Sequence, residues 1–370
     1  MRTLKHTSQS LYHCRGFSMV ELMVALVITL ILLAGIGQIF LSSKKSFTIQ
    51  NNLARIQENG RYAMEVVVSD LRRAGYWGGN ADIKSIDGSE GTYLVDDEAC
   101  TDSTPDGPSN WVRMLNRSIY GLDLTGDEKP SVNNYSCIQD AGATPYVRGD
   151  VMLVRYAHAS AVGSITKPLP CATGKTTIKD CYPDEYFLRS SLFRGRLFKG
   201  SESEDPVNTL VAPAIRTAEL VAHAYYIGTS SNTSACPADG AVPSLFRVEL
   251  SSSGGLSVEE IAYGVDNLQI KYGVDTSGNG IVNRYYDADE INPKPKPTPK
   301  NPAVVLPEIY WEDVISTRVW LLLRAECPET GYTNDNTYAM GNENYTPADT
   351  AGRGYRRKLY TSTIHMRNNR

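Results

Sequence analysis

The sequence has few of the residues and motifs on which enzymes depend. Of its 370 residues five are histidines, and only His158, His223 and His365 lie outside the first 16 residues. None of them belongs to an H-E-x-x-H motif, and no G-x-S-x-G nucleophile motif occurs. The run Gly-Lys-Thr at 174–176 is typical of a phosphate-binding loop, but Leu169 stands where that loop needs its first glycine. We therefore expect no enzyme, no required cofactor and, in particular, no exported hydrolase.

An excess of basic residues is also missing. The whole chain has a net charge of −4, although its first 16 residues carry Arg2, Lys5 and Arg15 and no acid. An acidic body disfavours broad binding of nucleic acid. One basic cluster, accompanied by Tyr355 and Tyr360, could stack bases or bind an acidic partner, but a solvated strand face is the preferred interpretation. Its members are Arg353, Arg356, Arg357 and Lys358.

The cysteines lack the C-x-x-C spacing of a metal site. Cys14 lies in the basic N-terminal stretch, and an even number remains: Cys100, Cys137, Cys171, Cys181, Cys236 and Cys327. We expect these to form three disulfides in an oxidising compartment. Free buried thiols in a cytosolic protein are the alternative. The sequence does not determine the pairing, although Cys171 and Cys181 would close the shortest loop.

Only one apolar run reaches membrane length. Residues 19–41, MVELMVALVITLILLAGIGQIFL, would span a hydrocarbon core of about 30 Å as a helix. The positive charge before it predicts that the leader is cytoplasmic and the body lies across the membrane. A secretory signal peptide or an uncleaved signal anchor would also fit the composition, but SSKKSF follows the run in place of an A-x-A site. Neither alternative explains Glu21, because a carboxylate inside an apolar segment needs a partner.

The residues around the start of this run are more specific. The sequence RGFSMVEL at 15–22 resembles the class III signal of type IV pilins and type II secretion pseudopilins. The resemblance implies that prepilin peptidase removes residues 1–16, cutting between Gly16 and Phe17, and that Phe17 becomes an N-methylated first residue. It also implies that Glu21 pairs with the N-terminal amine of a neighbouring subunit during fibre assembly. That amine would be the partner that the cost of a membrane carboxylate demands.

The apolar pattern continues beyond Lys44 and Lys45 as an amphipathic stripe. Its members recur at helical spacings and are Leu53, Ile56, Ala63, Val67, Leu71 and Ala74. One helix over 17–75, about 87 Å long to Ala74, would therefore include the membrane segment 17–41 and end at Gly75. Gly60 is a place where it could bend. We expect the stripe to pack on the body and the first half to pack against other subunits.

Several segments resemble the PilW family of minor pilins. They are QENGRYA and LRRAGY within 54–78, GDVMLVRY at 149–156, VDNLQIKYGVD at 265–275, and a tail with Arg356-Arg357 and RNNR at 367–370. The resemblance implies a minor pilin that primes pilus assembly near the fibre tip. Its partners would be other minor pilins, the major pilin, prepilin peptidase and the inner-membrane assembly platform. It would begin as a single-pass inner-membrane protein with a periplasmic head, and later stand on the pilus or cell surface.

Two alternatives remain within this architecture. One is a minor pseudopilin of the type II secretion tip complex; the size of the head and the QENGRYA segment favour the pilus. The other is an adhesin head displayed on a membrane stalk.

Residues 76–370 are rich in short strand-like runs separated by Gly, Ser, Asn and Pro, which predicts an α+β protein with a β-rich head. Leu268, Ile270 and Tyr272 alternate as in a strand with one buried face, whereas 319–323 is apolar on both faces and predicts a central strand. Residues 358–366 are expected to form a last strand. The segment 292–302, NPKPKPTPKNP, predicts an extended inserted loop.

One loop has a pattern that suggests a metal. The residues DTSGNGIV from Asp275 fit the opening of a calcium loop, with Ser277 and Asn279 as further oxygen ligands. Tyr286 stands where a bidentate glutamate is expected, so Asp287, Asp289 or Glu290 would have to supply a carboxylate. The alternative is a turn that joins two strands.

Overall fold

The computed structural model describes residues 16–80, 82–88, 114–124, 145–164, 167–169, 171–202, 216–231, 236, 242–252, 256–292, 309–347 and 350–368. Two compact units, Met1–Asn52 and Leu53–Arg370, make up the chain. The first unit contains the N-terminal half of the long helix, and we call the second unit the head. Leader residues 1–15, Cys100, Cys137 and residues 293–302 lie outside the described residues.

The long N-terminal helix is confirmed. Helix α1 is continuous over Met19–Arg73, two residues shorter at each end than expected. Gly75 follows it with a φ of +74°, the left-handed conformation that commonly ends a helix. The amide of Ala74 still donates to the Asp70 carbonyl, while that of Gly75 donates to the Arg155 carbonyl on a strand. The chain therefore leaves the helix directly into the sheet.

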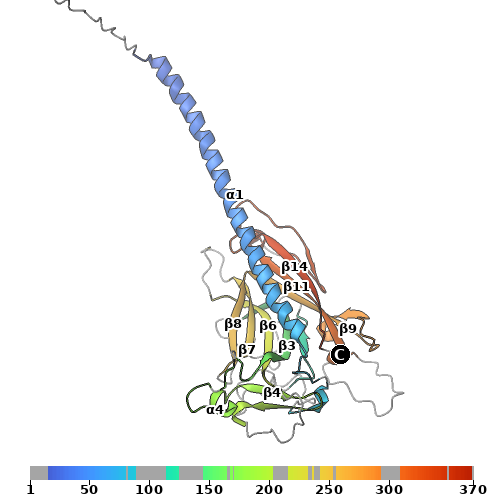
Figure 1. Cartoon of the computed structure of the whole chain (residues 1–370). Coiled ribbons are helices and arrows are strands. Elements are labelled where there is room, and N and C mark those ends of the chain that lie inside the picture. Colours follow the sequence, from blue (N-terminus) through green and yellow to red (C-terminus); the bar gives the residue numbers. More distant parts are fainter. Residues whose placement is uncertain are drawn as a thin grey trace, which may run out of the picture. The chain divides into compact units, whose positions relative to one another are not determined.

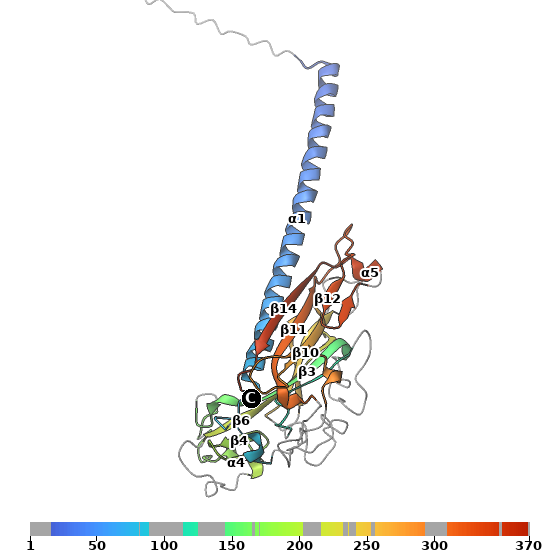
Figure 2. The ribbon, with the colours of Figure 1, turned by 90° about the vertical axis from the view of Figure 1, so that its right-hand side faces the viewer.

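The head contains two sheets, which confirms the α+β class (Figures 1 and 2). The larger sheet has the order β1 (Ile86–Asp87), β5 (Gly195–Lys199), β4 (Tyr186–Ser190), β6 (Arg216–Thr229), β3 (Tyr146–Ala161), β2 (Ile119–Leu122), and β7 (Pro243–Leu250) and β8 (Leu256–Tyr263) branch from β6. The smaller sheet has the order β10 (Arg284–Tyr286), β9 (Val265–Val274), β11 (Val314–Arg324), β14 (Arg357–His365). A separate hairpin joins β12 (Tyr338–Met340) to β13 (Glu343–Tyr345).

Short helices lie between the strands. They are η1 (Ile83–Ser85), α4 (Ile178–Cys181), η2 (Gly200–Glu202), η4 (Ala288–Glu290), η5 (Trp311–Asp313) and α5 (Thr350–Arg353). All strand pairs in the two sheets are antiparallel except β1 with β5.

The strand predictions for the smaller sheet are confirmed. Strand β11 pairs with β9 on one side and with β14 on the other, as its two apolar faces predict. In β9, Leu268, Ile270 and Tyr272 are at most 2% exposed and belong to the main core. Strand β14 is the last strand. The alternation of apolar residues and the run that is apolar on both faces thus predicted these strands correctly. Each pattern indicates directly which face of a strand is buried.

The second half of α1 packs on the head through the expected stripe. Ile56, Ala63, Val67, Leu71 and Ala74 are buried in the main hydrophobic cluster, together with residues of both sheets. Leu53 is only half-buried. The stripe therefore joins the helix to the sheets as predicted.

Gly60 serves for close packing within this contact. Helix α1 continues through Gly60. A Cβ atom there would lie 2.4 Å from the ring of Tyr360 on β14. The adjacent Asn59 donates to the Tyr263 carbonyl at 2.9 Å. Asn59 and Gly60, both in the QENGRYA segment, thus bring the helix into close contact with strands β8 and β14.

A second hydrophobic cluster lies beyond the end of α1. Trp77 and Ile86, which follow the helix in sequence, pack there with Leu188 of β4 and Leu197 of β5. Figures 1 and 2 both show β4 and α4 at this end of the head. We call this part the distal lobe, residues 77–88 and 171–202. It shares the larger sheet with the rest of the head.

Two disulfides are present among the described residues. Cys171 pairs with Cys181, and Cys236 pairs with Cys327. The first closes the short loop anticipated from sequence, next to α4. The second joins segments that lie far apart in the sequence. Both agree with an oxidising compartment.

Candidate assembly site

The N-terminus of α1 forms a capping box. The amide of Glu21 donates to the Ser18 hydroxyl at 3.1 Å, and the amide of Ser18 faces the Glu21 carboxylate at 3.5 Å. The reciprocal arrangement satisfies two amides that a helix start otherwise leaves free. Phe17, directly before it, is 82% exposed. Sequence reasoning found Glu21 but missed the cap, although the S-x-x-E spacing is its signal.

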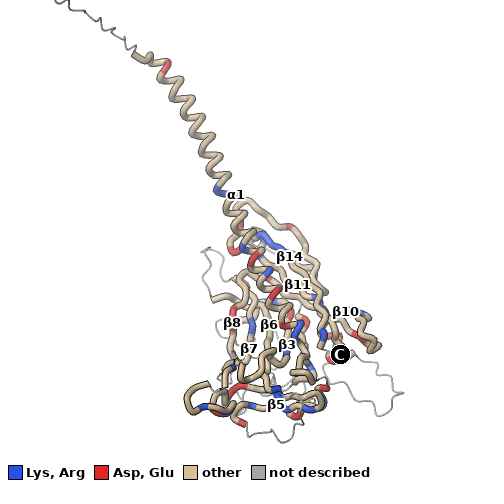
Figure 3. The backbone as a smooth tube through the Cα atoms, in the orientation of Figure 1, with Lys and Arg blue, Asp and Glu red and all other residues tan. Residues whose placement is uncertain are grey.

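The helix that follows exposes its apolar residues on every side. Except for Gly37, every residue from 16 to 48 is exposed. Among the described residues, α1 is the one helix long and apolar enough to cross a membrane. Figure 3 shows almost no charge along this half of α1, whereas charged residues are spread over the head. The only charged residue in 19–41 is Glu21. This segment therefore presents a surface that needs a lipid or protein partner.

The basic cluster near the C-terminus is bound to carboxylates. Arg353 lies 3.5 Å from Asp335, and Arg356 lies 2.5 Å from Glu329. Arg357 donates its Nε to the Asp266 carboxylate at 2.7 Å, with both side chains at most 4% exposed. The predicted solvated strand face is therefore wrong for Arg357, which is buried in an ion pair, whereas the side chain of Arg353 remains partly exposed.

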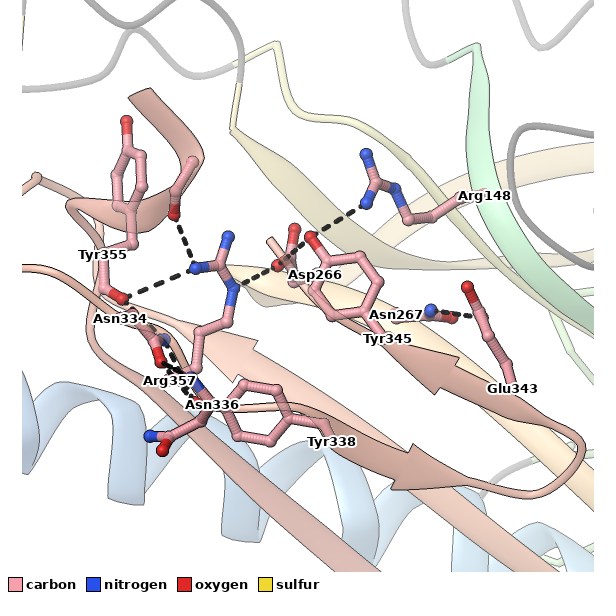
Figure 4. Close-up of polar contacts among 11 residues, drawn as sticks. Arg148, Asp266, Asn267, Asn334, Asn336, Tyr338, Glu343, Tyr345, Tyr355 and Arg357 are labelled. Atoms are coloured by element: carbon pink, nitrogen blue, oxygen red, sulfur yellow. Dashed lines mark hydrogen bonds and ion pairs between the residues drawn. The ribbon is translucent and has the colours of Figure 1, made fainter. Parts of the chain in front are cut away.

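Figure 4 shows the Asp266–Arg357 pair beside Tyr345 of the β12–β13 hairpin. Tyr345 of the hairpin donates its hydroxyl to Asp266 at 3.2 Å and accepts one hydrogen bond from Arg148 at 3.0 Å. Nearby, the buried Asn267 donates to Glu343 of the hairpin at 2.9 Å. This network fastens the hairpin and β14 to β9.

A buried carboxylate joins the second half of α1 to the larger sheet. Asp70 is 4% exposed. Tyr156 of β3 and Tyr225 of β6 donate their hydroxyls to it at 2.8 and 2.5 Å, and Nδ1 of His223 lies 2.5 Å away. Burial by itself would raise the pKa of Asp70, but the hydrogen bonds from His223 and the two tyrosines outweigh it and lower the pKa.

Sequence reasoning missed this group. Its signal was a charged residue within the apolar stripe, three positions after Val67 and next to Leu71. An acid at a buried position of a helix indicates polar partners on the facing element.

A third buried carboxylate joins the two sheets. Asp150 accepts hydrogen bonds from the Leu124 amide at 3.1 Å and from the Ile270 amide of β9 at 2.7 Å. A Cβ on the adjacent Gly149 would lie 2.6 Å from the Leu268 carbonyl, so only glycine permits this approach. Burial raises the pKa of Asp150 well above its usual range, and the charge of Asp123 adds to that increase.

The structure brings together only part of the expected calcium loop. Asp275 accepts hydrogen bonds from the Ser277 hydroxyl and the amides of Gly278 and Gly280. Asn279 accepts from the Ile281 amide, and Asp287 pairs with Lys271 at 2.9 Å. Burial opposes ionisation of Asp275, but its hydrogen bonds, led by that from Gly280, outweigh burial and lower the pKa.

These contacts make the loop a turn closed by its own carboxylate. Among the described residues, no group of three or more His, Cys, Asp or Glu side chains is placed to hold a metal ion. Calcium binding therefore stays a prediction.

Comparisons with known proteins match the two ends of the chain. Residues 224–368 match the family model described as type IV pilus-assembly protein W, and residues 11–37 match that of the prokaryotic N-terminal methylation motif. Searches of curated proteins and of solved structures found no match. The resembling segments within 54–78 and at 149–156 lie outside the first match, which includes β7, β8, β9, β11 and β14. The chain thus carries a match to the N-terminal methylation motif at its start and resembles the type IV pilus-assembly protein W family over residues 224–368.

Proposed function

We propose that this chain is a minor pilin that primes assembly of a type IV pilus and remains near the fibre tip. The observation that carries the proposal is the combination of a methylation motif, an exposed apolar helix and a C-terminal part of the head, residues 224–368, that matches a pilus-assembly family. Its role is structural: it positions other subunits and catalyses nothing itself. The head would fold in the periplasm, where the Cys171–Cys181 and Cys236–Cys327 disulfides can form.

Processing and assembly would use the start of α1. Prepilin peptidase removes residues 1–16 and leaves Phe17 as a methylated N-terminus beside the capping box. Residues 19–41 hold the subunit in the inner membrane until the assembly platform moves it into the fibre. A carboxylate at membrane depth costs about 2.5–3.5 kcal/mol on insertion scales, so Glu21 gains from the amine of a neighbouring minor or major pilin. The exposed first half of α1 then packs among the helices of those subunits.

The first experiment is intact-mass spectrometry of the membrane-extracted protein from its own host, beside a Gly16→Ala variant. We expect the wild type to begin at methylated Phe17 and the variant to retain its leader. Retention of residues 1–16 in both proteins, or cleavage after Leu41, would refute the proposal.

A second experiment addresses assembly. Glu21→Gln should leave the head folded but reduce recovery of the chain in sheared pili, whereas Glu65→Gln, on an exposed face of α1, should not. Loss of protein secretion with normal pili in a deletion strain would point to a type II secretion pseudopilin instead. Normal pili that no longer bind a surface would point to an adhesin.

A further inference from the structure

The distal lobe ends in a turn that exposes two adjacent apolar side chains. Leu192 and Phe193 connect β4 to β5 and are 57% and 79% exposed. Phe193 is the most exposed large apolar side chain in the described part of the head. Turns between strands, such as this connection over residues 191–194, are rich in Gly, Pro, Asn, Asp and Ser, because those residues suit the backbone of a turn. A Leu-Phe pair at this position is not explained by the turn.

The turn is held in one conformation. The amide and the hydroxyl of Ser191 both donate to the Arg194 carbonyl, at 2.8 and 3.0 Å. The Ser191 hydroxyl oxygen in turn accepts from the amides of Phe193 and Arg194, at 3.4 and 3.2 Å. Ser191 itself is 4% exposed. The apolar pair therefore extends from a fixed base, so that binding would order little additional chain.

Positive charge flanks the pair. Arg194 and Arg196 are exposed, and neither forms an ion pair within the part of the chain that the structure describes. This differs from the C-terminal basic cluster, where three arginines have carboxylate partners. An aromatic side chain with adjacent arginines is the composition of an interface hot spot, and unpaired arginines favour an acidic rim on the partner.

The position of the turn, in the distal lobe beyond the end of α1, indicates its binding partner. Helix α1 enters the head at Leu53 and ends at Arg73, and the distal lobe packs beyond that end through Trp77 and Ile86. We propose that Leu192 and Phe193 insert into an apolar pocket, bordered by acidic side chains, on the head of a neighbouring pilin subunit. This inference rests on the proposed pilus function.

A lipid surface is a less favourable partner for this turn than a protein pocket. One myristoyl chain gives only marginal membrane binding, and two side chains on a turn bury less apolar surface than that chain. A shaped protein pocket adds directional contacts to both arginines. The turn is therefore better suited to a protein than to a membrane.

The test is photo-crosslinking in the piliated host. A benzophenone amino acid replaces Phe193 in the full chain, and a matched control replaces Ile281, which is 65% exposed. We expect a light-dependent adduct from position 193 and none from 281. The adduct should lie in the head of another chain with an N-terminal methylation motif, at a peptide containing Asp or Glu. Adducts with lipid only, with proteins lacking that motif, or none at all would overturn the inference.

Variants give an independent measure. Leu192→Ser with Phe193→Ser should reduce piliation at least about tenfold, and Arg194→Glu with Arg196→Glu should also reduce it. Ile281→Ser should not. Unchanged thermal unfolding and normal leader removal show that the variants fold and are processed. If they form pili at the wild-type level while Glu21→Gln does not, the docking turn is wrong and the proposed function stands.

Discussion

The two halves of α1 differ in what covers their apolar residues. From residue 19 to 41 every residue except Gly37 is exposed, although the sequence is almost wholly apolar. From residue 53 to 73 the sequence is more polar, and yet its apolar stripe is buried in the head. One helix thus provides a surface for partners outside the chain and a surface for its own fold. We expect substitutions in the first half to affect assembly and those in the second to affect stability.

Charge follows the same division. The first half has a single acid, Glu21, at its capped end. The second half contains Asp70, which is buried but bound by three side chains of the sheet. An acid inside an apolar surface needs a partner in either case. In the head that partner is built into the chain, and for Glu21 we infer that a neighbouring subunit supplies it.

The largest difference should come from a matched pair of leucines. Leu71→Ala should lower the free energy of unfolding of the head by about 3–5 kcal/mol, because it leaves a cavity in the main core. Leu32→Ala should leave that stability unchanged. All four tryptophans lie in the head, so their fluorescence during thermal unfolding of the full chain in detergent reports on it alone. Equal effects of the two substitutions would contradict the division.

The buried acid gives the next effect. Asp70→Asn should cost about 2–3 kcal/mol, because an amide cannot accept all the hydrogen bonds that the carboxylate receives. The control is Glu65→Gln, five residues earlier on an exposed face, which should change stability by less than about 0.5 kcal/mol. The same fluorescence measurement applies. An Asp70→Asn protein as stable as its control would mean that the network contributes nothing to holding the helix.

Substitution of a glycine by alanine should destabilise the head when the glycine lies in the second half of α1 but not when it lies in the first. Gly60→Ala should destabilise the head by about 1–2 kcal/mol, because the new methyl would meet the ring of Tyr360. Because Tyr360 itself packs on the core, Tyr360→Ala should cost less stability in the Gly60→Ala chain than in the wild type. Gly35 has nothing within 4 Å of its Cβ position, so Gly35→Ala should not destabilise the head. A stabilising Gly60→Ala would show that the tyrosine moves aside at no cost.

Much of this architecture could be predicted from the sequence, because its signals are periodic or sit in one short motif. The apolar run, the amphipathic stripe and the two-faced strand 319–323 each report directly which side chains are buried. The basic cluster was interpreted as a solvated strand face, which is wrong for Arg357, because its buried carboxylate partner Asp266 lies far away in the sequence.

The buried polar contacts that join one element of the head to another could not be predicted from sequence. Asp150 binds Leu124 and Ile270, and Asp266 binds Arg357, over sequence separations that no local pattern encodes. Gly60 shows the same limit. A glycine at this position suggested a bend in the helix, whereas in the structure it allows close packing against Tyr360 of the last strand. Contacts of this kind depend on topology, which brings distant residues together only after the sheets have formed.

The smallest effect concerns pH and separates two of the buried acids. The folded pKa of Asp70 lies below its ordinary value of 3.8, so its contribution is present above about pH 4 and is lost as pH falls through the lower folded pKa. The folded pKa of Asp150 lies above 3.8. Between that value and the raised pKa the folded state holds a proton that the unfolded state has released, so stability declines as pH rises through this window.

The free energy of unfolding should therefore depend on pH in two ranges. It should fall towards acid pH because of Asp70, and it should decline with rising pH above about pH 4 because of Asp150. Asp70→Asn should flatten the acid limb below about pH 4, and Asp150→Asn should flatten the decline above it. Glu21→Gln, in the first half of α1, should alter neither limb of the head's stability. A profile in which Asp150→Asn steepens the decline above pH 4 would mean that Asp150 is ionised in the folded head, and that the joint between the two sheets is held by charge rather than by a protonated carboxyl group.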